Sequence, residues 1–150
     1  MFKNIKRRIT KSFRELLVYH HDSLEYRAKI LTLIVSADGK TCACEEEKLQ
    51  IVASMIYPDD PDRASFLLDT VKEYHLKIIT NNGLDFEHLI QQVIKDTKSI
   101  KRFSKKIDME LLQIFDACVN EEDEEEVYYR KHLLAFLKEL KEEHSQEEAS

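Results

Sequence analysis

Residues 24–39 read LEYRAKILTLIVSADG, and this stretch decides the fold class. Its apolar side chains cover much of the circumference of a helix instead of a single stripe; they are Leu24, Ala28, Ile30, Leu31, Leu33, Ile34, Val35 and Ala37. This pattern predicts a central, largely buried helix from about Leu24 to Ala37. Asp38-Gly39 ends that helix, because glycine readily adopts the left-handed conformation that commonly follows a helix.

The rest of the chain indicates further helices and no sheet. Charged residues make up 35% of the chain, while glycine and proline occur only twice each. A β-sandwich or barrel needs more turn residues, and a glycine-rich phosphate loop cannot be written with two glycines. Apolar residues recur at helical spacing in six more segments: 5–20, 44–57, 62–75, a segment capped by Asp85, 105–119 and 123–143. We therefore expect one all-α domain, a compact bundle of about seven helices.

A weak internal repeat relates positions that are 82 residues apart. Before the first turn, Ile30 aligns with Leu112 and Leu33 with Phe115. The turn residue Asp38 then aligns with Asn120; beyond the turn the aligned pairs are Ile51 and Leu133, Val52 and Leu134, Ala53 and Ala135, and Met55 and Leu137. The repeat predicts two pseudo-symmetric helical hairpins that bury their apolar faces against each other. Chance matching of two helical patterns is the alternative.

The two halves of this repeat resemble the tellurite-resistance TerB-like family. The resemblance rests on a hydrophobic helix that ends in Ala37-Asp38-Gly39, followed by Glu45-Glu46-Glu47 at the start of the next helix. A degenerate second copy runs from Phe115 to Asn120, and an acidic run and an apolar helix follow it. The resemblance covers residues 22–142. It implies a compact helical bundle, an association with tellurite resistance and general stress responses, and a divalent-metal site of acidic residues at the two turns.

The chain departs from the family pattern at both turns. Asn120-Glu121 stands where the family has Asp-Gly, and Cys42 and Cys44 stand where small polar residues are usual. The same family domain occurs beside J-domains in membrane-anchored co-chaperones. This chain has no His-Pro-Asp tripeptide, so it is not itself a J-domain.

Oxygen-bearing side chains at the two turns are candidate ligands for Ca²⁺ or Mg²⁺, the cations that prefer oxygen. The candidates are Asp38, Glu45, Asn120, Asp123 and Glu126. A folded pair of hairpins would bring them together. The alternative is ordinary capping, in which these side chains bind backbone N–H groups and complement helix dipoles.

Three cysteines, an odd number, argue against a disulfide framework, and we expect reduced thiols. Cys42 and Cys44 lie at a predicted helix N-terminus, where the helix dipole lowers thiol pKa. Cys118 precedes the second turn. If the turns are neighbours, the three thiols could take part in redox chemistry or bind a soft metal or an oxyanion such as tellurite. The alternative is a purely structural role.

The first residues form a basic segment. Residues 1–14 contain no acid and six cations, Lys3, Lys6, Arg7, Arg8, Lys11 and Arg14. Apolar residues such as Ile5, Ile9 and Phe13 share one helical face, so this segment could bind anionic membrane or an acidic partner. It could equally pack on the domain's own core. We expect a basic amphipathic helix over 1–21, the TerB-like helical domain over 22–143 and a flexible acidic tail over 144–150.

Together these patterns predict a non-enzymatic interaction or scaffold module, with no certain cofactor. The net charge of −6 disfavours nucleic acid as a partner, and no catalytic motif is present. We expect protein partners and a cytoplasmic location, either free or peripheral to the inner face of the membrane. The alternatives are a peripheral membrane adaptor that uses the basic segment and a thiol-based redox or soft-metal protein.

Overall fold

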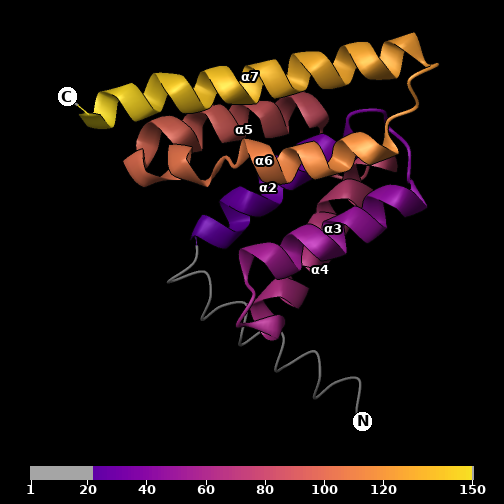
Figure 1. The fold of residues 1–150 in the computed structure, drawn as a ribbon, viewed down its shortest axis with the longest axis horizontal. Coiled ribbons are helices and arrows are strands. Elements are labelled where there is room, and N and C mark those ends of the chain that lie inside the picture. Colours follow the sequence, from indigo (N-terminus) through magenta and orange to yellow (C-terminus); the bar gives the residue numbers. More distant parts are fainter. Residues whose placement is uncertain (1–21, 150) are drawn as a thin grey trace.

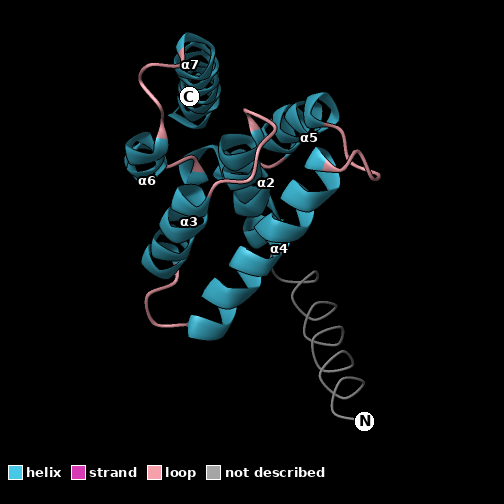
Figure 2. Ribbon diagram, turned by 90° about the vertical axis from the view of Figure 1, so that its right-hand side faces the viewer, coloured by secondary structure: helices cyan, strands magenta, loops and turns pink. Residues whose placement is uncertain are grey.

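The computed structural model describes residues 22–149, and within that range it contains helices and no strand. The helices, in chain order, are α2 (Asp22–Ser36), α3 (Ala43–Ile56), α4 (Pro61–Ile79), α5 (Phe86–Ser99), the 3₁₀ helix η1 (Lys101–Lys106), α6 (Met109–Gln113), the 3₁₀ helix η2 (Ile114–Cys118) and α7 (Glu124–Ala149). The predicted all-α bundle is confirmed (Figures 1 and 2). The predicted first helix, and with it the count of seven, lies outside the described residues.

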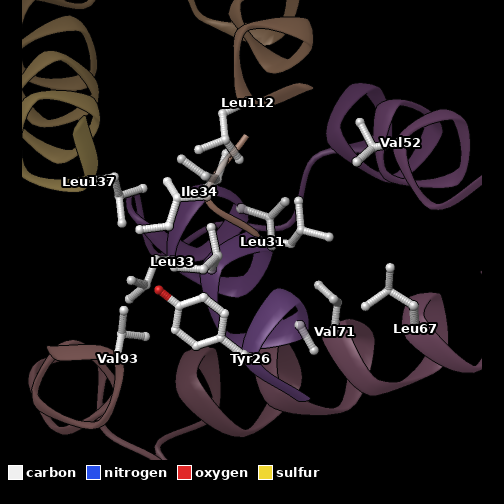
Figure 3. Close-up of a cluster of buried hydrophobic side chains, with 14 of the residues drawn as sticks. Tyr26, Leu31, Leu33, Ile34, Val52, Leu67, Val71, Val93, Leu112 and Leu137 are labelled. Carbon is white, nitrogen blue, oxygen red and sulfur yellow. The ribbon is translucent and has the colours of Figure 1, made fainter. Parts of the chain in front are cut away.

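Helix α2 is the centre of the bundle, as its sequence predicts. It contacts α4, α5, α7 and η1, and in Figure 2 it lies among α3, α4 and α5. Every residue from Ile30 to Ser36 is buried. Side chains from five other helices meet those of α2 in one core (Figure 3); those labelled in the figure are Val52, Leu67, Val71, Val93, Leu112 and Leu137. A helix that is apolar on nearly all sides is stable only in such a surrounded position.

The buried hydroxyl groups of α2 and α5 have hydrogen-bond partners. The buried Tyr26 hydroxyl shares a hydrogen bond of 2.7 Å with Thr97 Oγ1. The Thr97 hydroxyl also donates to the Val93 carbonyl, and Thr32 donates to Ala28 in the same way. Burial raises the pKa of Tyr26 to about 12, so the phenol stays neutral. The Tyr26 ring stacks on Phe103 at 4.6 Å, which joins α2 to η1.

Two predicted helices differ from the structure. The segment 105–119, expected as one helix, is divided into the end of η1, then α6 and η2. Ile107 is extended and fully buried, and Asp108 then begins α6 by accepting hydrogen bonds from the N–H groups of Glu110 and Leu111. Burial of Ile107 therefore overrides helical continuity. Conversely, α4 runs past His75 to Ile79 and includes the short apolar run that begins at Leu76.

The repeat keeps its register before the turns but not after them. Ile30 and Leu112 are both buried, as are Leu33 and Phe115. Beyond the turns, Met55 is 53% exposed whereas the aligned Leu137 is fully buried. The pseudo-symmetry of two hairpins therefore stays a prediction.

The last helix is longer than the sequence indicates. Helix α7 continues to Ala149, through the segment expected as a flexible tail, and His144 is buried. In residues 22–149, no helix is long and apolar enough to cross a membrane.

Candidate functional site at the paired turns

The first turn follows α2. Gly39 has φ +70°, a backbone conformation that residues with a Cβ rarely adopt. Its N–H donates to the Ser36 carbonyl. Asp38 Oδ1 accepts a hydrogen bond of 3.0 Å from the N–H of Lys40. The predicted Asp-Gly helix end is thus present, and one oxygen of Asp38 is used within the turn.

The second turn joins η2 to α7. Asn120 Oδ1 accepts from the N–H of Glu122 at 3.1 Å. Asp123 Oδ1 accepts from the N–H groups of Glu125 and Glu126, both at 3.2 Å, and so caps the start of α7. These contacts are the capping chemistry that the sequence offered as the alternative to metal ligation.

A disulfide links the two turns. Cys44 in the first turn of α3 is bonded to Cys118 at the end of η2, with 5.6 Å between their Cα atoms. The expectation that the thiols are reduced is therefore wrong for these two residues. An odd number of cysteines leaves one thiol over but does not prevent a single pair, and a separation of 74 residues conceals their proximity. Cys42, which precedes α3, is a free, half-buried thiol.

A small cavity opens beside the disulfide. Its volume is about 30 Å³, and residues from both turns line it. Three carboxylates, Asp38, Glu45 and Glu126, share this lining with Cys118 and Arg130. We call the two turns, the disulfide and this cavity the paired-turn site. The sequence-based prediction that the bends meet and gather negative charge agrees with this geometry.

Glu45 is the most perturbed carboxyl of the site. Burial, with the negative charges of Asp38 and Glu126, raises its pKa to about 7, while Arg130 acts in the opposite direction. Arg130 is already engaged: its Nε donates to Asp116 at 2.8 Å and its guanidinium donates to the Leu112 carbonyl at 2.9 Å. The cavity therefore keeps an excess of negative charge at neutral pH.

The predicted metal ligands are brought together only in part. Asp38, Glu45 and Glu126 line the cavity, whereas Asn120 and Asp123 are not among its lining residues and serve the turns instead. Among the described side chains, those of residues 23–145, no group of three or more His, Cys, Asp or Glu is arranged to hold a metal ion. A cation site at these residues therefore stays a prediction.

Two contributors to the site were not found from the sequence. His75 on α4 bonds Ser36 Oγ at 2.7 Å through Nδ1 and Thr41 Oγ1 at 3.2 Å through Nε2, so it ties α4 to the first turn. Burial lowers the pKa of His75, although Asp38 and Glu46 oppose that shift. Arg130 is the second contributor. Helical spacing shows neither contact, because both join segments that are distant in sequence.

The other predicted surface, the basic residues Lys3, Lys6, Arg7, Arg8, Lys11 and Arg14, lies outside the described residues. Comparison with known proteins adds no family assignment: no family model matches the chain, nor does any curated protein or solved structure. The resemblance to the TerB-like family stays a prediction from the two turn motifs.

Proposed function

We propose that this chain is a non-enzymatic interaction module of the TerB type, whose paired-turn site responds to redox conditions. The observation that carries the proposal is the disulfide between Cys44 and Cys118. It joins two segments that lie 74 residues apart in the sequence. Opening it would release the start of α3 from the end of η2 at the place where three carboxylates gather.

The redox step needs only a thiol reductant. Reduction transfers two electrons and two protons to the disulfide, and two glutathione molecules supply them by becoming glutathione disulfide. In a cytoplasmic location, which we also propose, disulfides are usually transient and redox-sensing. That behaviour agrees with the stress association implied by the family resemblance.

The size of the cavity supports an interaction role over catalysis. About 30 Å³ of accessible volume holds a water molecule or a small ion but not an organic substrate. One carboxylate oxygen of Asp38 is occupied by a turn hydrogen bond, and Arg130 is committed to Asp116. These groups are better suited to holding two turns together than to reacting with a substrate.

Two-dimensional amide NMR of the full chain tests the proposal. We expect reduction to shift the resonances of residues 38–45 and 115–130 while those of Leu33, Leu67 and Val93 stay in place. A chain with Cys44→Ser and Cys118→Ser should reproduce the reduced spectrum in any buffer, and Cys42→Ser is the matched control that should keep the redox response. Identical spectra with and without reductant would refute the proposal, and so would loss of the whole folded spectrum.

A divalent cation is a second candidate ligand, because Asp38, Glu45 and Glu126 line one cavity and burial with mutual repulsion raises the pKa of Glu45. Binding would require Glu45 and Glu126 to turn toward a common point. Calorimetric titration with Ca²⁺, Mg²⁺ and Zn²⁺ tests it, with Asp38→Ala as the variant and the exposed Asp69→Ala as the control. Isotherms that are unchanged by Asp38→Ala would exclude this site.

The finer description of the fold belongs to the same proposal. We place α2 with α3, and α6 and η2 with α7, as two related hairpins whose turns form the paired-turn site. The matching burial of Leu33 and Phe115 before the turns supports this relation. The tellurite and stress context is carried over from the family resemblance alone.

A further inference from the structure

A second, larger cavity lies between α5 and α7, away from the disulfide. Its volume is about 240 Å³, and its walls are mostly apolar. The lining includes Phe86 and Ile90 from α5 and Tyr129, His132, Leu133 and Phe136 from α7. Figure 1 shows the two helices running side by side. We call this feature the α5–α7 groove.

Aromatic side chains at the mouth of the groove are poorly covered. Tyr129 is 57% exposed although it lines the groove, and its neighbour Tyr128 is 60% exposed. The Tyr128 ring lies 4.2 Å from that of His132, which continues the aromatic surface beyond the cavity. A contiguous apolar surface of this kind marks a place where another apolar surface binds.

Acidic residues flank the groove on both helices. Asp85 and Glu87 are the exposed neighbours of Phe86 at the start of α5. Glu125 is exposed and lies one helical turn before Tyr129 on α7. The fitting occupant is therefore an amphipathic segment with an apolar face and positive charges along its edges.

The chain itself carries a segment of that chemistry. Residues 2–14 contain six cations and no acid, and their apolar residues recur at the spacing of one helical face, at Phe2, Ile5, Ile9 and Phe13. This segment lies outside the described residues, so its chemistry is taken from sequence alone. It is complementary to the groove in both hydrophobicity and charge.

The connection to α2 is long enough for binding within one molecule. Ala37, directly after the far end of α2, lines the groove, and the 15 residues of α2 span about 22 Å. The eight residues 14–21 reach about 26 Å when extended, so Phe13 can reach the groove from Asp22. A short tether also raises the effective concentration of the segment, to the millimolar range for flexible linkers.

We propose that residues 2–13 bind the α5–α7 groove of their own chain. Phe2, Ile5, Ile9 and Phe13 face the aromatic lining, and the lysines and arginines face Asp85, Glu87 and Glu125. This inference is independent of the redox proposal, because it concerns different residues.

Photo-cross-linking in the full chain tests the contact. The photoreactive residue p-benzoylphenylalanine replaces Phe13 on the apolar face or, as the control, Asn4 on the opposite face. We expect Phe13-position cross-links within one chain to peptides that contain residues 86–90 or 129–136, and few from the Asn4 position. Cross-links between two chains, cross-links to other helices only, or none would overturn the proposal.

Charge reversal at the acidic residues that flank the groove distinguishes this contact from non-specific hydrophobic association. Glu87→Lys with Glu125→Lys should lower the yield of groove cross-links about five-fold, because two attractive rim charges become repulsive. The matched control, Glu47→Lys with Asp69→Lys, makes the same change in net charge at exposed positions on α3 and α4 and should leave the yield unchanged. Equal losses of cross-link yield in both double variants would contradict the role assigned to Glu87 and Glu125.

A vesicle-binding experiment distinguishes groove binding from the alternative of membrane binding. Co-sedimentation with phosphatidylglycerol vesicles, measured for the same full-chain proteins, reports whether residues 2–13 prefer an anionic surface. Vesicle binding by a chain that gives no groove cross-links in lipid-free buffer would assign the segment to membranes and overturn the groove proposal. Groove cross-links formed in lipid-free buffer would support it.

Discussion

The core around α2 and the paired-turn site differ in how their polar groups are paired. In the core, Tyr26 and Thr97 satisfy each other at 2.7 Å, and burial keeps the phenol neutral by raising its pKa to about 12. At the paired turns, Glu45 lies near two other acids, and the available cation, Arg130, is bonded to Asp116.

This difference separates the part of the molecule that provides stability from the part that can respond to its surroundings. The core has few polar groups that change state near neutral pH or with redox conditions. The paired-turn site has a carboxyl whose pKa is near 7 and a bond that thiol reductants can open. Substitutions in each region should therefore differ in size and in their dependence on conditions.

The largest effect is expected from truncation in the centre of α2. Leu33 is fully buried, so Leu33→Ala should lower the free energy of unfolding by about 3 kcal/mol through lost burial and a residual cavity. Urea unfolding followed by circular dichroism measures it. Leu76→Ala, at a position 59% exposed, is the control and should change stability by less than about 0.5 kcal/mol. Similar losses in both variants would show that the core is misplaced.

Loss of the disulfide should follow. Cys44→Ser removes a link across 74 residues, and the unfolded chain gains the freedom that the link withheld. We expect a loss of about 2–4 kcal/mol under oxidising conditions and little difference from wild type in reductant. Cys42→Ser is the matched control and should unfold like wild type in both buffers. A stability of Cys44→Ser equal to that of wild type without reductant would remove the disulfide from the account.

A smaller effect is expected for one core hydrogen bond. Tyr26→Phe deletes the hydroxyl that bonds Thr97 but keeps the ring stacked on Phe103. Thr97 retains its bond to Val93, so the loss should be about 1 kcal/mol and independent of pH between 5 and 8. Unfolding midpoints at several pH values check both parts. A pH-dependent loss would place a titrating group in this region of the core.

The smallest effect at any single pH is expected at Glu45, but its dependence on pH is diagnostic. The pKa is raised from 4.5 to about 7 in the folded state, so the folded chain binds more protons than the unfolded chain between these values. Wild type should therefore lose stability relative to Glu45→Gln as pH rises from 4.5 to 7, by less than about 1 kcal/mol after solvent screening.

The difference between wild type and variant isolates Glu45 from the nearby His75, whose lowered pKa makes protonation destabilising at acidic pH. Urea midpoints across the window provide the measurement, and Glu47→Gln, at an exposed position on the same helix, is the control. A difference that stays flat with pH, or rises toward alkaline pH, would contradict the assigned burial.

Much of the fold was predictable because local patterns specify it. The apolar circumference of residues 24–37 predicts a surrounded helix, and Gly39 marks its end through backbone freedom alone. The break at Ile107 was not predictable from periodicity, because its extended conformation depends on burial of that side chain in the bundle. The same limit applies to the register of Met55 against Leu137.

The position of the candidate site was predictable from the sequence, but its chemistry was not. The repeat predicted that Asp38, Glu45 and Glu126 approach one another, and all three line one cavity. Whether Asn120 and Asp123 face that cavity or cap a turn depends on backbone geometry that spacing does not encode. The pairing of Cys44 with Cys118 depends on the packing of η2 against α3, which becomes visible only in three dimensions.

The central claim is that a disulfide joins the two turns, and peptide mapping by mass spectrometry tests it most directly. The full chain is alkylated without reductant, digested and searched for linked peptides. We predict one linked pair that contains Cys44 and Cys118, with Cys42 alkylated. Alkylation of all three cysteines after incubation with excess glutathione disulfide, or a link that uses Cys42, would contradict the account.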